Sequence, residues 1–182
     1  MIKMRQPSLV LHSHDVPGYR YQMWKTAELP RGVNATNVVN WIHWGIDHCS
    51  ESYLHNVIIN CHGEPGALLI GGNGSNKLEC GNVGVFHSLR EKAAVGTIWL
   101  VACRMAENSA KGYPKWFLGP KFCSALAQAA GCDVVAADVK QYVDVLYTVY
   151  HPFGTIDDFE GKVYRFSPGP EGRREDYTPP SG

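Results

Sequence analysis

Short hydrophobic runs alternate along this chain with longer segments in which apolar residues recur every three or four positions. Runs rich in Val and Ile and bounded by turn residues are typical of buried strands in a parallel sheet, and helical spacing is typical of amphipathic helices. We expect strands at Ser8–Ser13, Asn56–Asn60, Ala67–Ile70, Gly96–Ala102, Asp133–Asp138 and Lys162–Phe166, with a strand-like pattern at Gln141–His151, and helices at Asn34–Cys49, Val83–Ala94 and Gly119–Gly131. This alternation predicts an α/β fold with a mostly parallel central sheet and helices on both faces.

The chain is long enough to form one domain with its own hydrophobic core. It has 182 residues, and its hydrophobic content of 45% and charged content of 19% are ordinary for a globular protein. We expect a single domain over residues 1–166. Ser167–Gly182 is rich in Pro and Gly among mixed charges, which predicts a flexible C-terminal tail.

Two of the predicted strands end in a reactive side chain followed by a small or turn-forming residue. VIINCHG places His62 and Gly63 after one apolar run, and TIWLVAC places Cys103 after another. Parallel sheets bring chemistry to the carboxyl ends of their strands, so neighbouring strands here would set an imidazole beside a thiol. A cysteine nucleophile needs such a base to form its thiolate. Cys61 is a competing thiol, but strand alternation predicts that it points into the core.

In these motifs the chain resembles the caspase-like cysteine peptidases (clan CD). The matching residues are Ile58-Ile59-Asn60-Cys61-His62-Gly63 and Trp99-Leu100-Val101-Ala102-Cys103, and Phe122–Val139 is similar to the helix and next strand of bacterial members. The resemblance covers roughly Asn56–Val139 and is nearest to the bacterial CHAT, gingipain and self-cleaving toxin-type domains.

The resemblance implies a three-layer caspase-like fold and a cysteine endopeptidase that acts on a protein or peptide substrate without a cofactor. A bacterial toxin or effector domain is one setting that it implies. Cys103 would be the nucleophile, and the backbone N–H groups of Gly63 and Cys103 would form the oxyanion hole. His62 would either take the thiol proton or protonate the leaving amine, and the sequence leaves both versions open.

The specificity and regulation of such an enzyme are weakly encoded in the sequence. Asp138, at the end of a predicted strand, could attract a basic substrate side chain or cap a turn, and Arg104, beside the nucleophile, could hold an acidic one or form a surface ion pair. Glu107–Leu118 follows Cys103 directly and has the composition of a loop that could be cut or ordered on activation. Within it, Lys111 and Lys115 are candidate cutting points or anion contacts, although an ordinary connecting loop explains the same residues.

Two alternative functions remain open at this point. One is a catalytically inactive caspase-like domain that binds a partner protein, because fold does not fix function. The other is a metal hydrolase built on His12, His14 and His62, since a His-x-His at a strand end places both rings on one side. The leading interpretation expects no metal site.

Composition narrows the range of partners. Basic and acidic residues balance at 17 each, which argues against a nucleic-acid partner, and no apolar run approaches the length of a membrane span, so we expect no membrane partner. The beginning of the chain has no apolar stretch of the kind found in a signal peptide. We interpret the six cysteines as free thiols in a reducing, cytoplasmic setting, with signal-independent secretion open and the oligomeric state undetermined.

Overall fold

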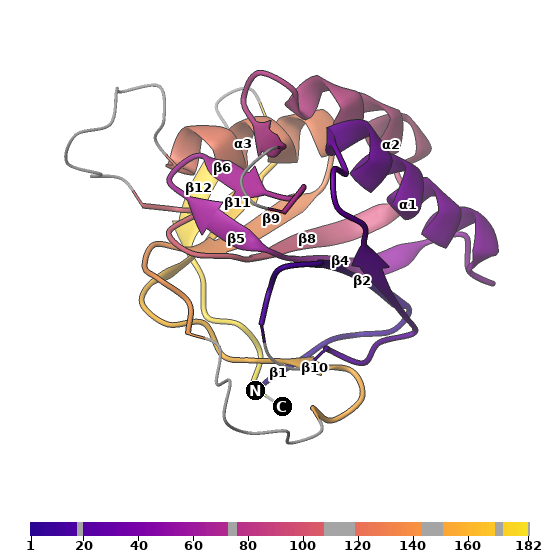
Figure 1. The fold of residues 1–182 in the computed structure, drawn as a ribbon, viewed down its shortest axis with the longest axis horizontal. Helices are drawn as coiled ribbons and strands as arrows, with labels where there is room; N and C mark the ends of the chain where they lie inside the picture. Colours follow the sequence, from indigo (N-terminus) through magenta and orange to yellow (C-terminus); the bar gives the residue numbers. More distant parts are fainter. Residues whose placement is uncertain (18–19, 73–75, 108–118, 143–150, 170–172, 182) are drawn as a thin grey trace.

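The computed structural model describes residues 1–182 except 18–19, 73–75, 108–118, 143–150, 170–172 and 182. Its main feature is a seven-stranded sheet (Figure 1). In spatial order the strands are β12 (Arg173–Asp176), β11 (Val163–Ser167), β9 (Asp133–Ala137), β8 (Val95–Val101), β4 (Leu54–Asn60), β2 (Ser8–Ser13) and β3 (Lys25–Leu29). The run from β9 to β3 is parallel throughout, and β11 and β12 add antiparallel strands at one edge. The mostly parallel α/β sheet is therefore confirmed.

The described helices lie together on one face of this sheet (Figure 1). They are α1 (Ala35–His48), the 3-10 helix η1 (Val83–Phe86), α2 (His87–Lys92) and α3 (Gly119–Ala130). Their apolar side chains join the inward residues of the sheet in the larger core cluster. The expectation of helices on both faces is thus wrong for the described residues.

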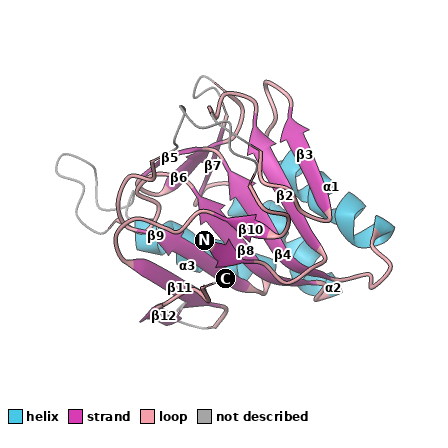
Figure 2. Ribbon diagram, turned by 90° about the horizontal axis from the view of Figure 1, so that it is seen from below, coloured by secondary structure: helices cyan, strands magenta, loops and turns pink. Residues whose placement is uncertain are grey.

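Non-helical segments cover the opposite face of the sheet. Val10, Ile58, Trp99 and Val135 point into a second core cluster, where residues near the N-terminus and around Ile156 cover them. A two-stranded sheet of β1 (Ile2–Lys3) and β10 (Thr155–Ile156) belongs to this layer (Figure 2). Apolar contacts hold the sheet on both sides, although only one side carries the described helices.

Helix α1 shows how the sequence determines an element and its orientation. Asn34 and Asn37 form a reciprocal capping box in which each side-chain oxygen accepts from the other residue's backbone N–H, at 3.1 and 3.0 Å. Val38, Ile42 and Ile46 recur at helical spacing and are buried against the sheet. The helix expected at Asn34–Cys49 is confirmed, and Asn34 is its N-cap residue.

A small antiparallel sheet follows directly after β4. It consists of β5 (His62–Glu64), β6 (Ala67–Leu69) and β7 (Lys77–Glu79). Pro65 and Gly66, with a φ of 83° at the glycine, form the turn between β5 and β6. The turn reverses the chain, so that β5 pairs antiparallel with β6.

The C-terminal segment differs from its prediction. Its described residues include β12, which pairs antiparallel with β11, and Ser181, which forms a bridge with Ile2. Tyr177 packs on Trp99, with ring centroids 6.1 Å apart. A flexible tail from Ser167 onward is therefore wrong for these residues, because sheet pairing and an aromatic contact fix them.

One strand was missed by the sequence analysis, and two predicted segments lie mostly outside the described residues. Strand β3 was not predicted, since its sequence KTAEL buries only Ala27 and Leu29. Most of the strand-like segment Gln141–His151 and most of the candidate regulatory loop Glu107–Leu118 lie outside the described residues, including Lys111 and Lys115. No helix of the described residues is long and apolar enough to cross a membrane.

Candidate active site

The paired ends of β4 and β8 place His62 and Cys103 next to each other in the fold. The two strands are parallel neighbours, and Asn60 is in register with Val101. His62 and Cys103 each stand two positions beyond this pair, and between them the Cys61 N–H donates to the Val101 carbonyl at 3.3 Å. Each motif therefore brings its reactive residue to the same edge of the sheet.

His62 and Cys103 line one pocket of about 250 Å³. Aromatic and acidic side chains from the layer opposite the helices make up much of its wall. The lining residues are Val16, Pro17, Tyr21, Asn60, Cys61, His62, Val101, Ala102, Cys103, Gln141, Tyr142, Asp157, Asp158, Phe159 and Glu160. The imidazole and the thiol thus open onto a common space that a ligand can enter.

The backbone of Gly63 lies directly against that of Cys103. A Cβ atom built on Gly63 would stand 2.7 Å from the Cys103 carbonyl oxygen and 3.0 Å from the Cys103 nitrogen. Real Cβ atoms are not found so close to backbone oxygen, so only glycine fits here. The absence of a side chain, rather than an unusual φ, is what this position requires.

A backbone carbonyl orients the His62 ring. Nε2 of His62 lies 3.3 Å from the Asp15 carbonyl oxygen. Because a carbonyl only accepts, the ring carries a proton on Nε2 and donates it to Asp15, so that Nδ1 is the nitrogen that can exchange a proton. The Asp15 carboxylate is itself held by the Ser13 hydroxyl, which donates to Oδ1 at 2.6 Å. Sequence reasoning missed Asp15, since a main-chain oxygen leaves no signal in residue type.

The turn after Cys103 is tight and firmly held. Arg104 adopts a left-handed conformation with a φ of 60°, which costs a non-glycine residue about 1 kcal/mol or more. Its N–H donates to the Val139 carbonyl at 2.8 Å, and its guanidinium pairs with Glu107. The thiol of Cys103 faces the Gln141 carbonyl, with sulfur and oxygen 3.6 Å apart. These contacts fix where the half-buried thiol stands.

Burial keeps the Cys61 side chain away from the site formed by His62 and Cys103. Its side chain belongs to the core on the helix side of the sheet, as alternation predicted. Burial raises the pKa of the Cys61 thiol, and the nearby Asp15 adds to the shift. The thiolate that a nucleophile needs is therefore disfavoured at Cys61.

The candidate specificity residues named from the sequence do not line the pocket. Asp138, which directly follows β9, is tied to the residue just before β11, because its Oδ1 accepts from the Lys162 N–H at 3.0 Å. Arg104 forms the ion pair with Glu107 described above. The structure gives both residues roles in holding the chain rather than contacts with the pocket.

The pocket instead contains carboxylates that sequence reasoning did not single out. Oδ2 of Asp157 accepts from the Tyr21 hydroxyl at 3.0 Å, and Oδ1 lies 2.8 Å from Nε2 of the buried His151. Asp158 pairs with the Met1 amino group at 2.7 Å. Among the described residues no cation contacts the Glu160 carboxylate. The segment TIDDFE, with its run of acidic residues, was the only sequence signal for this wall.

Gln141 connects the acidic segment to the candidate nucleophile. Its side-chain oxygen accepts from the Glu160 N–H at 3.1 Å, and its amide nitrogen donates to the Glu160 carbonyl at 3.2 Å. Its own carbonyl faces the Cys103 thiol. The acidic wall and Cys103 are therefore held in a fixed relation by one residue.

The three histidines of the metal hypothesis are not brought together. His12 is buried, its Nε2 accepts from the Tyr21 N–H at 3.1 Å, and its Nδ1 lies 3.0 Å from the Asn60 side-chain amide. Both of its nitrogens are thus occupied, while Nδ1 of the exposed His14 pairs with Glu28 at 2.8 Å. In the described part of the chain no group of three or more His, Cys, Asp or Glu residues could hold a metal ion.

Neither a scan against protein-family models nor a search of curated proteins finds a match for this chain. The geometry of the pocket and the two motifs are therefore the features that bear on function.

Proposed function

We propose that this chain is a cysteine endopeptidase of the caspase-like class, with Cys103 as nucleophile and His62 as its partner. The observation that carries the proposal is that His62 and Cys103 follow paired positions of adjacent parallel strands and line one pocket. The motif resemblance supports the same pair independently of the geometry.

The contacts of His62 suit an exchange of protons with Cys103. With Nε2–H directed to the Asp15 carbonyl, Nδ1 can take the proton of the thiol and later deliver it to the leaving amine. The Asp15 carbonyl then stabilises the imidazolium and keeps the ring from rotating. A base oriented by a third group is the arrangement that activated nucleophiles require.

The next step is attack of the Cys103 sulfur on the carbonyl carbon of a peptide bond. The oxygen of that carbonyl becomes an anion, and the N–H groups of Gly63 and Cys103 are the candidate donors to it. The close approach of the Gly63 backbone to Cys103 supports this assignment, because both N–H groups then come from one small region. The amine leaves with the proton from His62, and water hydrolyses the thioester on Cys103.

We also propose that the residue before the cut carries a basic side chain. Asp157 is held in the pocket wall by Tyr21 and lies next to His151, and Glu160 has no cationic partner among the described residues. Tyr21 and Phe159 supply aromatic surface that suits the aliphatic part of Lys or Arg. Carboxylates near a partly enclosed pocket favour a cation and disfavour an acid.

The experiment is a set of peptide substrates that differ only in the residue before the scissile bond, with Lys, Arg, Asp or Ala at that position. We expect turnover of the Lys and Arg substrates, and a loss of at least about a thousandfold in Cys103→Ala and of similar size in His62→Ala. Absence of cleavage of every peptide, together with a reactive Cys103, would favour the non-catalytic binding domain instead.

A further inference from the structure

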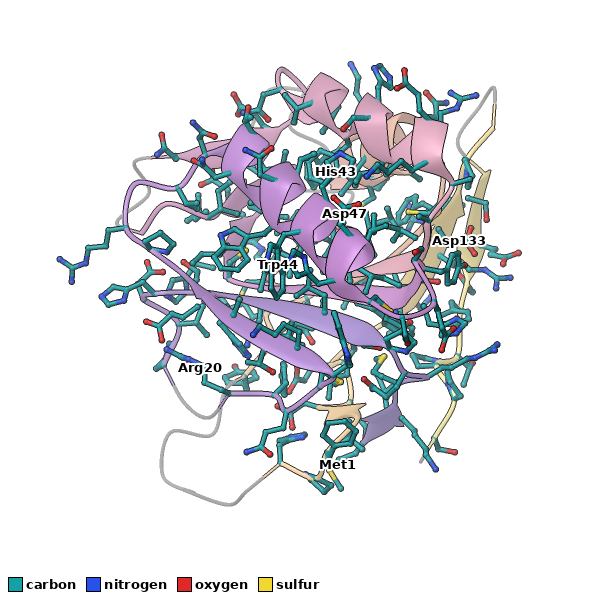
Figure 3. All side chains as sticks on the ribbon, turned by 90° about the vertical axis from the view of Figure 1, so that its right-hand side faces the viewer. Met1, Arg20, His43, Trp44, Asp47 and Asp133 are labelled. Atoms are coloured by element: carbon teal, nitrogen blue, oxygen red, sulfur yellow. The ribbon has the colours of Figure 1, made fainter. Side chains whose placement is uncertain are left out.

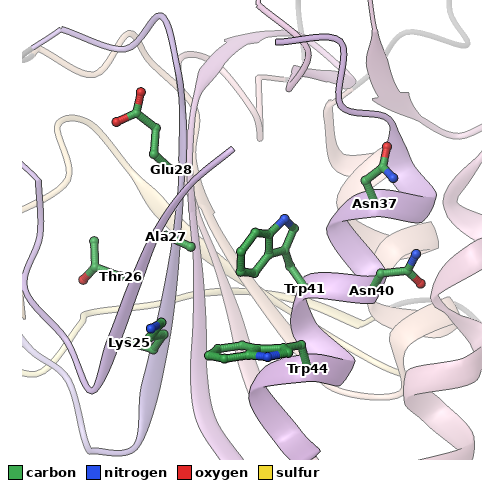
Figure 4. A pocket seen from close by; sticks show the side chains of 8 residues that line it. All are labelled: Lys25, Thr26, Ala27, Glu28, Asn37, Asn40, Trp41 and Trp44. Atoms are coloured by element: carbon green, nitrogen blue, oxygen red, sulfur yellow. The ribbon is translucent and has the colours of Figure 1, made fainter. Parts of the chain in front are cut away.

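A second hollow lies on the helix-bearing side of the sheet, between the edge strand β3 and helix α1. Figure 4 shows Lys25, Thr26, Ala27 and Glu28 on one side of it and the α1 side chains on the other. Its volume is about 600 Å³, and we call it the β3–α1 groove. Neither His62 nor Cys103 belongs to it.

The outer edge of β3 is open to pairing. β3 bonds to β2 along one edge, and no described strand pairs with the other. The opposite edge of the sheet, β12, consists entirely of charged residues (RRED), which is a common protection against unwanted strand addition. β3 has the sequence KTAEL, without proline, so its free N–H and C=O groups form a row on which an extended chain can pair.

Helix α1 turns a stripe of side chains toward this edge. Asn37, Asn40, Trp41 and Trp44 follow helical spacing beside the buried stripe of α1, and Trp41 also packs against the core. The two indoles meet edge to face (Figure 4), with ring centroids 5.8 Å apart, and both are only half buried. Figure 3 shows Trp44 on the side of α1 that faces the neighbouring strands. An indole pair beside a strand edge offers apolar area to alternate side chains of an added strand.

Among the described charged residues of the groove, the Lys25 ammonium is available to pair with an acidic group of a ligand. Glu28 pairs with His14 at 2.8 Å and with Arg20 at 3.3 Å, so its carboxylate is neutralised. The Lys25 ammonium lies 5.0 Å from the Trp44 ring centroid and contacts no carboxylate among the described residues. The groove is therefore complementary to an acidic side chain at the Lys25 end.

We propose that the β3–α1 groove binds an extended segment of a partner protein as an added strand. One acidic side chain of that segment lies at Lys25, and an apolar side chain packs on Trp41 and Trp44. Main-chain pairing with β3 supplies affinity, while the indoles and Lys25 supply selectivity. This site is independent of the proposed peptidase activity.

The test is selection from a display library of random linear peptides on the full chain carrying Cys103→Ala, so that cleavage does not affect the result. We expect enriched peptides with alternating apolar residues and a carboxylate. Their affinity falls roughly tenfold in Lys25→Glu and roughly thirtyfold or more in Trp44→Ala, the size of a hot-spot loss. Phe153→Ala, which removes another exposed aromatic, leaves affinity unchanged.

Two further measurements make the test specific. Selection repeated on Lys25→Glu should enrich basic peptides, and Asn40→Arg, an exposed change that fills the groove without touching the core, should block binding even if Trp44→Ala is unstable. The proposal would be overturned if no peptide is enriched. It would also be overturned if the enriched peptides bind with unchanged affinity to Lys25→Glu, Trp44→Ala and Asn40→Arg. A dimer that Asn40→Arg disrupts would overturn it also, because the occupant would then be a second copy.

Discussion

Gly63 and Cys103 touch through their backbones, with the position of a Gly63 Cβ only 2.7 Å from the Cys103 carbonyl oxygen. These residues belong to different motifs and are far apart in sequence. The contact shows that the turn after β4 and the turn after β8 form one unit, in which a change at either residue affects the other.

Gly63→Ala should therefore damage both stability and activity. The added methyl cannot avoid backbone atoms, and overpacking of this kind costs about 1–3 kcal/mol. We expect a lower free energy of unfolding in urea and a loss of peptide cleavage larger than the change in folded fraction. Gly84→Ala is the matched control, since a Cβ there meets nothing within 4 Å. Equal effects of the two changes would contradict the packing argument.

Cys61 and Cys103 should respond differently to removal of the thiol. Cys103→Ala should abolish cleavage with little change in unfolding. Cys61→Ala removes a buried sulfur from the core and should cost roughly 1 kcal/mol of stability while leaving activity in place. Loss of activity in Cys61→Ala alone would show that the wrong nucleophile has been named.

The acidic wall predicts a selective change in substrate preference. Glu160→Gln removes a carboxylate without a cationic partner among the described residues. We expect kcat/KM for the Lys and Arg peptides to fall about tenfold, the size of one charged contact, and that for a peptide with Ala before the cut to stay the same. Glu91→Gln, an exposed change on α2, serves as control. A uniform fall for all peptides would argue against a specificity role.

His12 predicts that the protein loses stability on mild acidification. Burial, with a smaller contribution from Arg20, lowers the pKa of His12 from 6.5 to about 4. The unfolded chain then binds more protons than the folded one between these values, so stability is full above pH 6.5 and falls as the pH drops toward 4. The free energy of unfolding lost over this pH range through His12 is roughly 3 kcal/mol.

The measurement is urea unfolding as a function of pH. His12→Gln, which keeps an acceptor for the Tyr21 N–H, should flatten the curve between pH 6.5 and 4, whereas exposed His48→Gln should not. Parallel curves for wild type and His12→Gln would mean that His12 is not the group responsible.

The sequence was sufficient for the inner strands of the central sheet, and the reason is physical. Strands such as β2 and β4 are buried on both faces, so their apolar runs are continuous, and α1 has a cap and an apolar stripe of its own. Edge strand β3 escaped prediction because half of its residues face solvent. Strand β12 was not predicted either, because its strand conformation comes from pairing with β11 rather than from its charged residues.

The site was predictable only in part for a similar reason. The sequence signal was strong for three residues, because each has a telling residue type and follows directly after an apolar strand: His62, Gly63 and Cys103. Asp15 contributes a backbone oxygen, and Asp157 reaches the pocket through a contact with Tyr21, 136 residues away in sequence. Such long-range placements follow from tertiary packing, which local patterns do not encode.

The central claim is that Cys103 is the thiol activated for attack, and covalent labelling tests it most directly. The probe is a short peptide ending in Lys with a thiol-reactive chloromethyl ketone in place of the scissile bond, and the readout is intact mass followed by peptide mapping. Burial raises the pKa of Cys61 and Cys123 and that of Cys132 to about 12, so these thiols should stay unlabelled near neutral pH. We expect one adduct, on Cys103, that forms much more slowly in His62→Ala. An adduct on another cysteine, or labelling of Cys103 at the same rate without His62, would contradict this claim.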